Sequence, residues 1–232
     1  SEMCIRDRYS DPQKNGTYLC KVGEYWWLNP AYPEVRQLVA DGVAEILAQY
    51  HVDGIHLDDY FYPTTETAFD AAAFADAKAD DLGAFRLEQV NAMVQQIYST
   101  VKAASPAIQL SISPQGTMDG NYTKQYADVR RWGTETGYCD VLIPQLYYGF
   151  ANETAPFAET LQTWTETVSS ESVSLVIGIG TMMPGLMRNA ADGSIVHSSG
   201  TASLIGSHAA LGYIVMGLLA FFLGVCVTVL LY

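Results

Sequence analysis

The spacing of apolar and polar residues predicts alternating helices and strands between residues 30 and 180. Apolar residues at helical spacing indicate amphipathic helices, and short apolar or alternating runs indicate strands. Helices are expected at residues 33–50, 85–104, 122–136 and 156–168. Strands are expected at residues 52–60, 108–113, 141–147 and 175–179. Residues 64–81 are rich in alanine and aspartate and are expected to form a long excursion with some helix.

The order of these elements predicts an α/β fold in which parallel strands are joined by right-handed helical crossovers. A doubly wound sheet and a (β/α)8 barrel both have this order. The strands of an open parallel sheet are apolar on both faces, whereas here Ile55 and Leu57 alternate with His56 and Asp58. A polar face that lines a closed barrel explains this alternation. We therefore predict a partial (β/α)8 TIM barrel that covers about the third or fourth to the seventh strand.

Two adjacent carboxylates, Asp58 and Asp59, end the first of the predicted strands. Barrel active sites lie at the carboxyl ends of the strands, so both residues are candidate catalytic groups. Strand alternation places Asp58 inward with His56 and turns Asp59 toward the rim or the following loop. The alternative is that Asp58 makes a structural hydrogen bond and that Asp59 caps the loop.

Amide, phenol and aromatic side chains collect at the same predicted end of the barrel, which suits sugar recognition. Sugar hydroxyls take hydrogen bonds from amides and phenols, and the apolar face of a sugar stacks on aromatic rings. The alternative is that the glutamines bond to one another inside the barrel and that the tyrosines pack. Trp27 and Asn29 are expected to end a further strand before the first helix. The candidate substrate-binding residues are Trp27, Asn29, His56, Tyr60, Tyr62, Gln115, Gln145, Tyr147 and Tyr148.

Composition and charge divide the chain into an acidic main part and an apolar C-terminal tail. The chain has 25 acidic residues against 12 Lys and Arg, a net charge of −13, which argues against general nucleic-acid binding. Residues 209–232 are uncharged apart from the chain terminus and long enough to cross a bilayer as one helix, although a buried core helix is the alternative. We expect an artefactual or disordered N-terminus at 1–20, the barrel at 21–181, a linker at 182–208 and a candidate transmembrane helix at 209–232. The cysteines form no C-x-x-C pair and phosphate-loop and zinc-protease motifs are missing, so we predict no cofactor and no metal.

With these residues in hand, the chain resembles the glycosyl-hydrolase-like family ten, a bacterial TIM-barrel family, over roughly residues 26–180. The most specific run is DGIHLDDYFYP at residues 53–63. Supporting runs are WLNP at 27–30, ISPQG at 112–116, YADV at 126–129 and PQLYY at 144–148. The chain departs from the family at residues 85–91, which read FRLEQVN, and after Gly180.

The resemblance implies hydrolysis of bacterial polysaccharide, cell-wall glycan among the candidates, by a protein that is extracellular or in the cell envelope. It implies that the strand of His56 and Asp58 is the fourth of the barrel, with Asp58 as nucleophile or charge-stabilising base. The general acid is not identified. Three alternatives stay open, namely a carbohydrate-binding barrel without catalysis, a membrane-tethered envelope protein and an inactive gene fragment.

Overall fold

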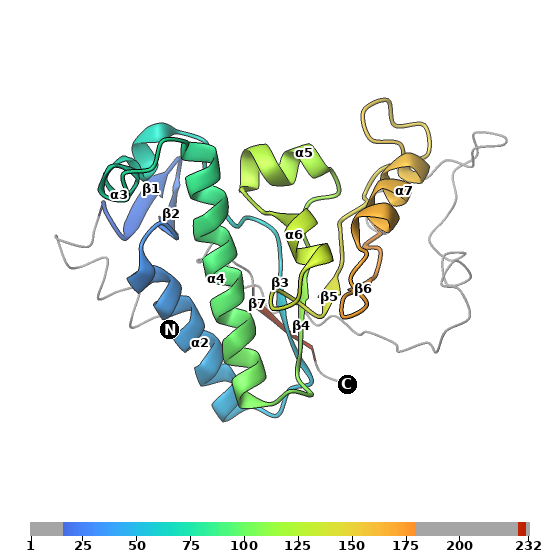
Figure 1. Ribbon diagram of the computed structural model, residues 1–232, viewed down its shortest axis with the longest axis horizontal. Helices are drawn as coiled ribbons and strands as arrows, with labels where there is room; N and C mark the ends of the chain where they lie inside the picture. Colours follow the sequence, from blue (N-terminus) through green and yellow to red (C-terminus); the bar gives the residue numbers. More distant parts are fainter. Residues whose placement is uncertain (1–15, 180–226, 231–232) are drawn as a thin grey trace.

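Four strands that follow one another in the chain also lie next to one another in one parallel sheet (Figure 1). A computed structural model describes residues 16–179 and 227–230. The four strands are β3 (Gly54–Leu57), β4 (Gln109–Ile112), β5 (Val141–Leu142) and β6 (Ser174–Leu175). Their register pairs His56 with Ser111, and Ser111 with Val141. The predicted α/β fold with parallel strands is confirmed, and it is compatible with part of a TIM barrel.

The helices predicted from apolar periodicity are present as α2 (Pro33–Gln49), α4 (Leu82–Ala104) and α7 (Phe157–Thr167). Pro33 begins α2, where its missing N–H costs no hydrogen bond. The Asp81 side chain caps α4 by accepting the Ala84 N–H. Helices α2 and α4 lie side by side (Figure 1), so the two crossovers on either side of β3 pack against each other.

The predicted helix at 122–136 is wrong as a single element. The structure has α5 (Met118–Gly120), η2 (Asn121–Gln125) and, after a break, α6 (Val129–Thr134). Tyr126 causes the break, because its φ of 51° is left-handed and cannot continue a right-handed helix. The expected excursion at 64–81 contains only η1 (Thr67–Phe69) and α3 (Ala71–Asp76).

The core lies between one face of the parallel sheet and the helices. Ile55, Leu57 and Leu110 are fully buried on that face. They belong to one apolar cluster with Val94 of α4 and Trp164 of α7. Burial of each large apolar side chain stabilises the fold by about 1.5–3 kcal/mol. The opposite face of the sheet is thereby left for polar side chains.

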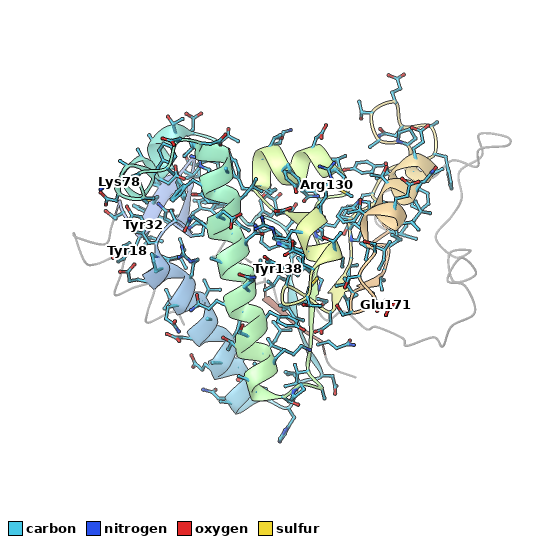
Figure 2. The ribbon with its side chains drawn as sticks, viewed as in Figure 1. Tyr18, Tyr32, Lys78, Arg130, Tyr138 and Glu171 are labelled. Atoms are coloured by element: carbon cyan, nitrogen blue, oxygen red, sulfur yellow. The ribbon has the colours of Figure 1, made fainter. Side chains whose placement is uncertain are left out.

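The strand expected before the first helix is present and ends beside Trp27 and Asn29, but it belongs to a two-stranded antiparallel hairpin and not to the parallel sheet. Its strands are β1 (Leu19–Val22) and β2 (Tyr25–Leu28), and β1 crosses the boundary predicted at residue 20. Gly23 turns the hairpin with a φ of 60°. The rings of Tyr18 and Tyr32 lie 4.9 Å apart and join the hairpin to the start of α2 (Figure 2).

A strand from the C-terminal end of the chain, β7 (Val227–Leu230), pairs antiparallel with β3. The helix predicted at 209–232 is therefore wrong for these residues, because an extended segment satisfies the backbone N–H and C=O groups along the edge of β3. Residues 1–15, the predicted linker at 182–208 and the rest of the predicted membrane helix, 209–226, lie outside the described residues. Among the described residues, none of the helices combines the length and apolar character needed to cross a bilayer.

Candidate active site

Two N–H donors converge on the Asp58 carboxylate just beyond β3. Gln145 Nε2 donates to Asp58 Oδ1 over 2.7 Å, and the Asp59 backbone N–H donates to the same oxygen over 2.8 Å. Gln145 reaches this position because it lies just past β5, where it bridges to Gln115 on one side and to Gly178 on the other. The parallel sheet thus brings together two predicted site residues that are 87 positions apart in the chain.

On the polar face of the sheet, hydrogen bonds link the residues next to Asp58 across neighbouring strands. Gln145 Nε2 also lies 3.1 Å from the Ser113 backbone oxygen, and the Ser113 hydroxyl donates to the Ile143 carbonyl. Farther along, His56 Nδ1 lies 2.8 Å from the Ser111 hydroxyl. Burial lowers the pKa of His56, and the nearby Asp58 charge opposes that shift only in part. The imidazole is therefore held in its neutral form beneath the carboxylate.

Asp59 is more deeply buried than Asp58, and its carboxyl is turned to the loop that follows β3, as the capping alternative expects. Only 7% of Asp59 is exposed, and its Oδ1 accepts the Tyr60 backbone N–H over 2.6 Å. Burial raises the pKa of Asp59, and the Asp58 charge raises it further. Hydrogen bonds from the Tyr60 N–H and the Gln115 side chain lower the pKa but do not cancel the shift. The two neighbouring carboxyls therefore occupy different electrostatic environments.

The loop after β4 packs against the end of β5 and so positions Gln115. A side chain at Gly116 would meet the Gln145 carbonyl at 2.5 Å and the Tyr148 ring at 2.6 Å, so only glycine fits there. Asn121 is fully buried and exchanges hydrogen bonds with the backbone N–H and C=O of Gln115. The sequence reasoning missed Asn121, because nothing in its local pattern separates it from an ordinary helical residue.

Two of the predicted tyrosines lie near the carboxylates. Tyr147 is 42% exposed, and burial, followed by the charges of Asp58 and Asp59, raises its pKa. Burial also raises the pKa of Tyr148, with a smaller contribution from Asp59. Both phenols therefore stay protonated and can donate hydrogen bonds to a neighbouring group.

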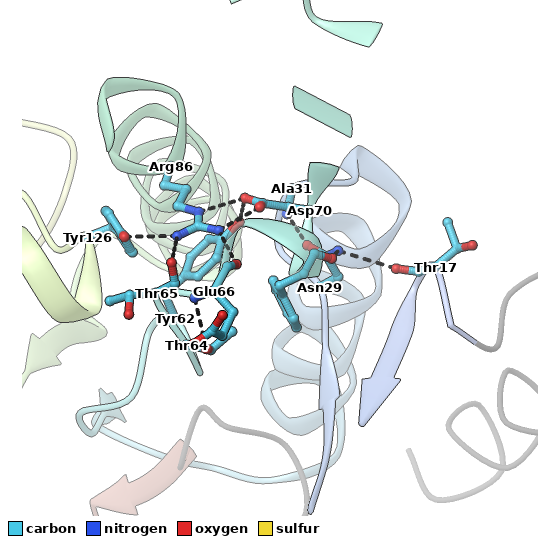
Figure 3. Close-up of polar contacts among 11 residues, drawn as sticks. Thr17, Asn29, Ala31, Tyr62, Thr64, Thr65, Glu66, Asp70, Arg86 and Tyr126 are labelled. Atoms are coloured by element: carbon cyan, nitrogen blue, oxygen red, sulfur yellow. Dashed lines mark hydrogen bonds and ion pairs between the residues drawn. The ribbon is translucent and has the colours of Figure 1, made fainter. Parts of the chain in front are cut away.

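The structure places Tyr62 away from this cluster, in a buried ion-pair network (Figure 3). Its hydroxyl donates to Asp70 Oδ2 over 2.6 Å, and Arg86 binds both oxygens of the same carboxylate. Arg86 also donates to the Tyr126 hydroxyl and to the Thr65 carbonyl. Tyr62, at 1% exposure, thus anchors the excursion that follows Asp59, a structural role in place of the predicted contact with substrate.

Asn29 is likewise internal. Its side chain donates to the Phe69 and Thr17 carbonyls and accepts the Ala31 N–H (Figure 3). It therefore ties the hairpin to the excursion. Trp27, two residues earlier, points elsewhere, and its ring centroid lies 6.3 Å from that of Tyr60.

The resulting cluster can support acid–base chemistry, because it pairs a hydrogen-bonded carboxylate with a buried carboxyl of raised pKa. Within residues 16–179, His, Cys, Asp and Glu side chains nowhere gather in groups of three that could hold a metal ion.

Comparisons with known proteins agree with this chemistry. The family model described as Glycosyl hydrolase-like 10 matches residues 9–190. Glycosyl hydrolase YngK from Bacillus subtilis (strain 168) is 30% identical over 187 residues, which are 72% of this chain and 36% of YngK. Glycosyl hydrolase DigH from Escherichia coli (strain K12) is 28% identical over 179 residues, which are 68% of this chain and 40% of DigH. The chain thus spans at most 40% of the length of these relatives.

Proposed function

This chain belongs to the Glycosyl hydrolase-like 10 family, and on that premise we propose that it hydrolyses glycosidic bonds of a bacterial polysaccharide. The observation that carries the proposal is the pair of unlike carboxyls at the carboxyl end of β3. Glycoside hydrolysis needs one carboxylate and one carboxylic acid around the scissile bond. Asp58 is proposed as the carboxylate and Asp59 as the carboxylic acid, and the two residues are adjacent in the chain.

Asp58 is the carboxylate of this mechanism. The amide of Gln145 and the Asp59 N–H both donate to Oδ1, so they orient the group and stabilise its negative charge. From this position Asp58 either attacks the anomeric carbon or takes a proton from the attacking water. A separation of about 5 Å between the two carboxyls favours retention, and about 6.5–9.5 Å favours inversion.

Asp59 is the group that holds the proton. Burial favours its neutral form, which can pass the proton to the glycosidic oxygen as the bond to the anomeric carbon breaks. Water then supplies the hydroxyl of the new reducing end and restores the proton. Gln115, Gln145, Tyr147 and Tyr148 surround the carboxyls and are proposed to bind sugar hydroxyls.

Cell-wall glycan is the proposed substrate, and the cell envelope or the exterior of the cell is the proposed location. Both follow from the family resemblance, and both relatives carry the name glycosyl hydrolase. A glycan substrate also agrees with the amide and phenol donors around Asp58.

The test is release of reducing ends from purified bacterial cell-wall glycan by the full chain and by Asp58→Asn. The asparagine keeps an oxygen that accepts from Gln145 but cannot act as nucleophile or base. We expect a loss of about a thousandfold or more in turnover. Asp53→Asn is the matched control, because Asp53 precedes β3 at its other end and is exposed.

Equal activity of Asp58→Asn and wild type would overturn the assignment. A chain that melts cooperatively and binds glycan, but releases nothing, would instead identify a carbohydrate-binding barrel. Binding that survives in Asp58→Asn while release is lost supports the hydrolase.

A further inference from the structure

Beside the two carboxyls lies a pair of aromatic rings that core packing does not explain. Tyr60 directly follows Asp59 and is 58% exposed. Its ring lies 6.3 Å from that of Trp27, with the planes inclined by 39°. Neither residue belongs to an apolar cluster in the part of the chain that the structure describes. Both rings therefore keep aromatic surface available to a ligand.

The exposed residue Tyr60 also has a strained backbone. Its φ of 68° is left-handed, which residues with a Cβ rarely adopt unless their surroundings fix it. Asp59 Oδ1 fixes it here by accepting the Tyr60 N–H over 2.6 Å. Strain of this kind concentrates at functional sites. The carboxyl proposed as proton donor thus also holds the exposed ring in place.

The hairpin presents Trp27 from the other side. Successive strand residues point to opposite faces, and Trp26 packs in the cluster of Leu19, Leu28 and Val35. Trp27 therefore faces away from that cluster and toward Tyr60. Its backbone is held by pairing with Cys20 of β1, so the ring stands on a rigid element.

We propose that Trp27 and Tyr60 form a stacking subsite for a pyranose ring of the glycan, adjacent to the bond that is cleaved. This inference rests on the proposed function and adds to it the residues that select a ring-shaped sugar. The C–H face of a pyranose is flat and apolar and packs on aromatic rings, while its hydroxyls remain at the edge for polar partners. The two tilted rings provide the first surface. Asp59, which accepts the Tyr60 N–H and is hydrogen-bonded by Gln115, provides the polar partner nearest to them.

The experiment measures binding of a soluble oligomer of N-acetylglucosamine by calorimetry, in the Asp58→Asn background so that nothing is cleaved. Trp27→Ala and Tyr60→Gly should each raise the dissociation constant about tenfold. Tyr50→Ala is the matched control, because Tyr50 is an equally exposed tyrosine (62%) that lies at the C-terminal end of α2, away from the hairpin. Its dissociation constant should not change.

Thermal stability separates a lost subsite from a damaged fold. Glycine adopts a positive φ without strain, so Tyr60→Gly should melt at a higher temperature while it binds more weakly. No binding to Asp58→Asn, unchanged affinity in both variants, or an equal effect of Tyr50→Ala would each overturn the subsite. If the variants weaken binding but the wild-type chain releases no reducing ends, the hydrolase proposal fails and the subsite stands. If hydrolysis proceeds and affinity is unchanged, the subsite alone fails.

Discussion

Burial and hydrogen bonding act in opposite directions on the Asp59 carboxyl, and burial is the larger effect. The pKa in the folded chain lies above the ordinary value of 3.8, so folding favours the protonated form. The stabilisation that this form provides is complete below pH 3.8 and is lost as the pH rises through the raised pKa. At neutral pH the buried Asp59 carboxyl therefore lowers the free energy of unfolding, and the same burial gives the residue the raised pKa that its proposed role as proton donor requires.

Asp59→Asn should remove that cost, because the amide is neutral at every pH and still accepts the Tyr60 N–H. We expect its melting temperature to exceed that of the wild type by about 2–4 °C near neutral pH. The two should converge below pH 3.8. Thermal melts across this range measure the difference. A gain of the same size at every pH would mean that the amide acts through packing instead of charge.

Gln145 acts on the reaction through Asp58. Gln145→Leu keeps much of the side-chain volume but removes the donor 2.7 Å from Asp58 Oδ1. We expect kcat to fall about 10- to 100-fold with a smaller change in KM, since the hydrogen bond orients a reacting group. Steady-state rates of reducing-end release test this.

The control for Gln145 is Gln109→Leu, an exposed glutamine at the start of β4, which should leave both constants unchanged. A rise in KM alone would show that Gln145 binds sugar and does not position Asp58.

The positions of site residues could be predicted where they follow strand alternation, but not where they depend on packing against distant parts of the chain. Alternation placed Asp58 on the polar face with His56, as the structure has them. Alternation does not predict the burial of Asp59, because that burial depends on the loop after β3, where Asp59 accepts the N–H of Tyr60 and the backbone of Tyr60 turns with a φ of 68°. The buried roles of Tyr62 and Asn29 depend on an excursion that carries no periodic signal of its own.

At the scale of elements, the link between the excursion after β3 and helix α4 depends on one buried ion pair. Arg86 and Asp70 are both fully buried as side chains, 2.6 Å apart. Arg86→Met would leave the Asp70 charge without its partner. We expect a loss of about 3–5 kcal/mol in the free energy of unfolding, measured by urea denaturation.

The matched control for this ion pair is on the same helix. Glu88 pairs with Arg131 at the surface and is 59% exposed as a side chain. Glu88→Gln should cost less than about 1 kcal/mol, because solvent screens an exposed pair. Similar losses in both variants would show that the Arg86 network contributes no more than a surface pair.

Elements with a strong internal period were predictable, and elements fixed by distant partners were not. The apolar stripes of α2 and α4 define them without reference to the rest of the chain. The helix expected at 122–136 breaks at Tyr126, whose hydroxyl accepts from Arg86, 40 positions away. No local pattern contains that contact. The antiparallel partner of β2 was missed although Gly23 marks the turn between two apolar runs.

At the scale of the whole molecule, one sheet brings together strands that lie far apart in the chain. Strand β3 has β4 on one side and β7, from residues 227–230, on the other. Composition alone suggested a membrane helix for that stretch, because uninterrupted apolar runs satisfy both a bilayer and a buried strand. The length of the apolar run does not distinguish a membrane helix from a strand, because only four residues of the run, 227–230, pair with β3. The partner that decides is the edge of β3, some 170 positions earlier.

Proline substitutions at two successive residues of β7 test whether this strand pairs with β3, and each variant serves as the control for the other. In an antiparallel pair, alternate N–H groups point toward the partner and away from it. Thr228→Pro and Val229→Pro should therefore differ, because only one removes a hydrogen bond to β3, whose His56 and Ile55 they face. We expect one variant to lose about 1–3 kcal/mol more than the other in urea denaturation. Equal and small losses in both would show that β7 does not pair with β3 in solution, and that the sheet ends at β3.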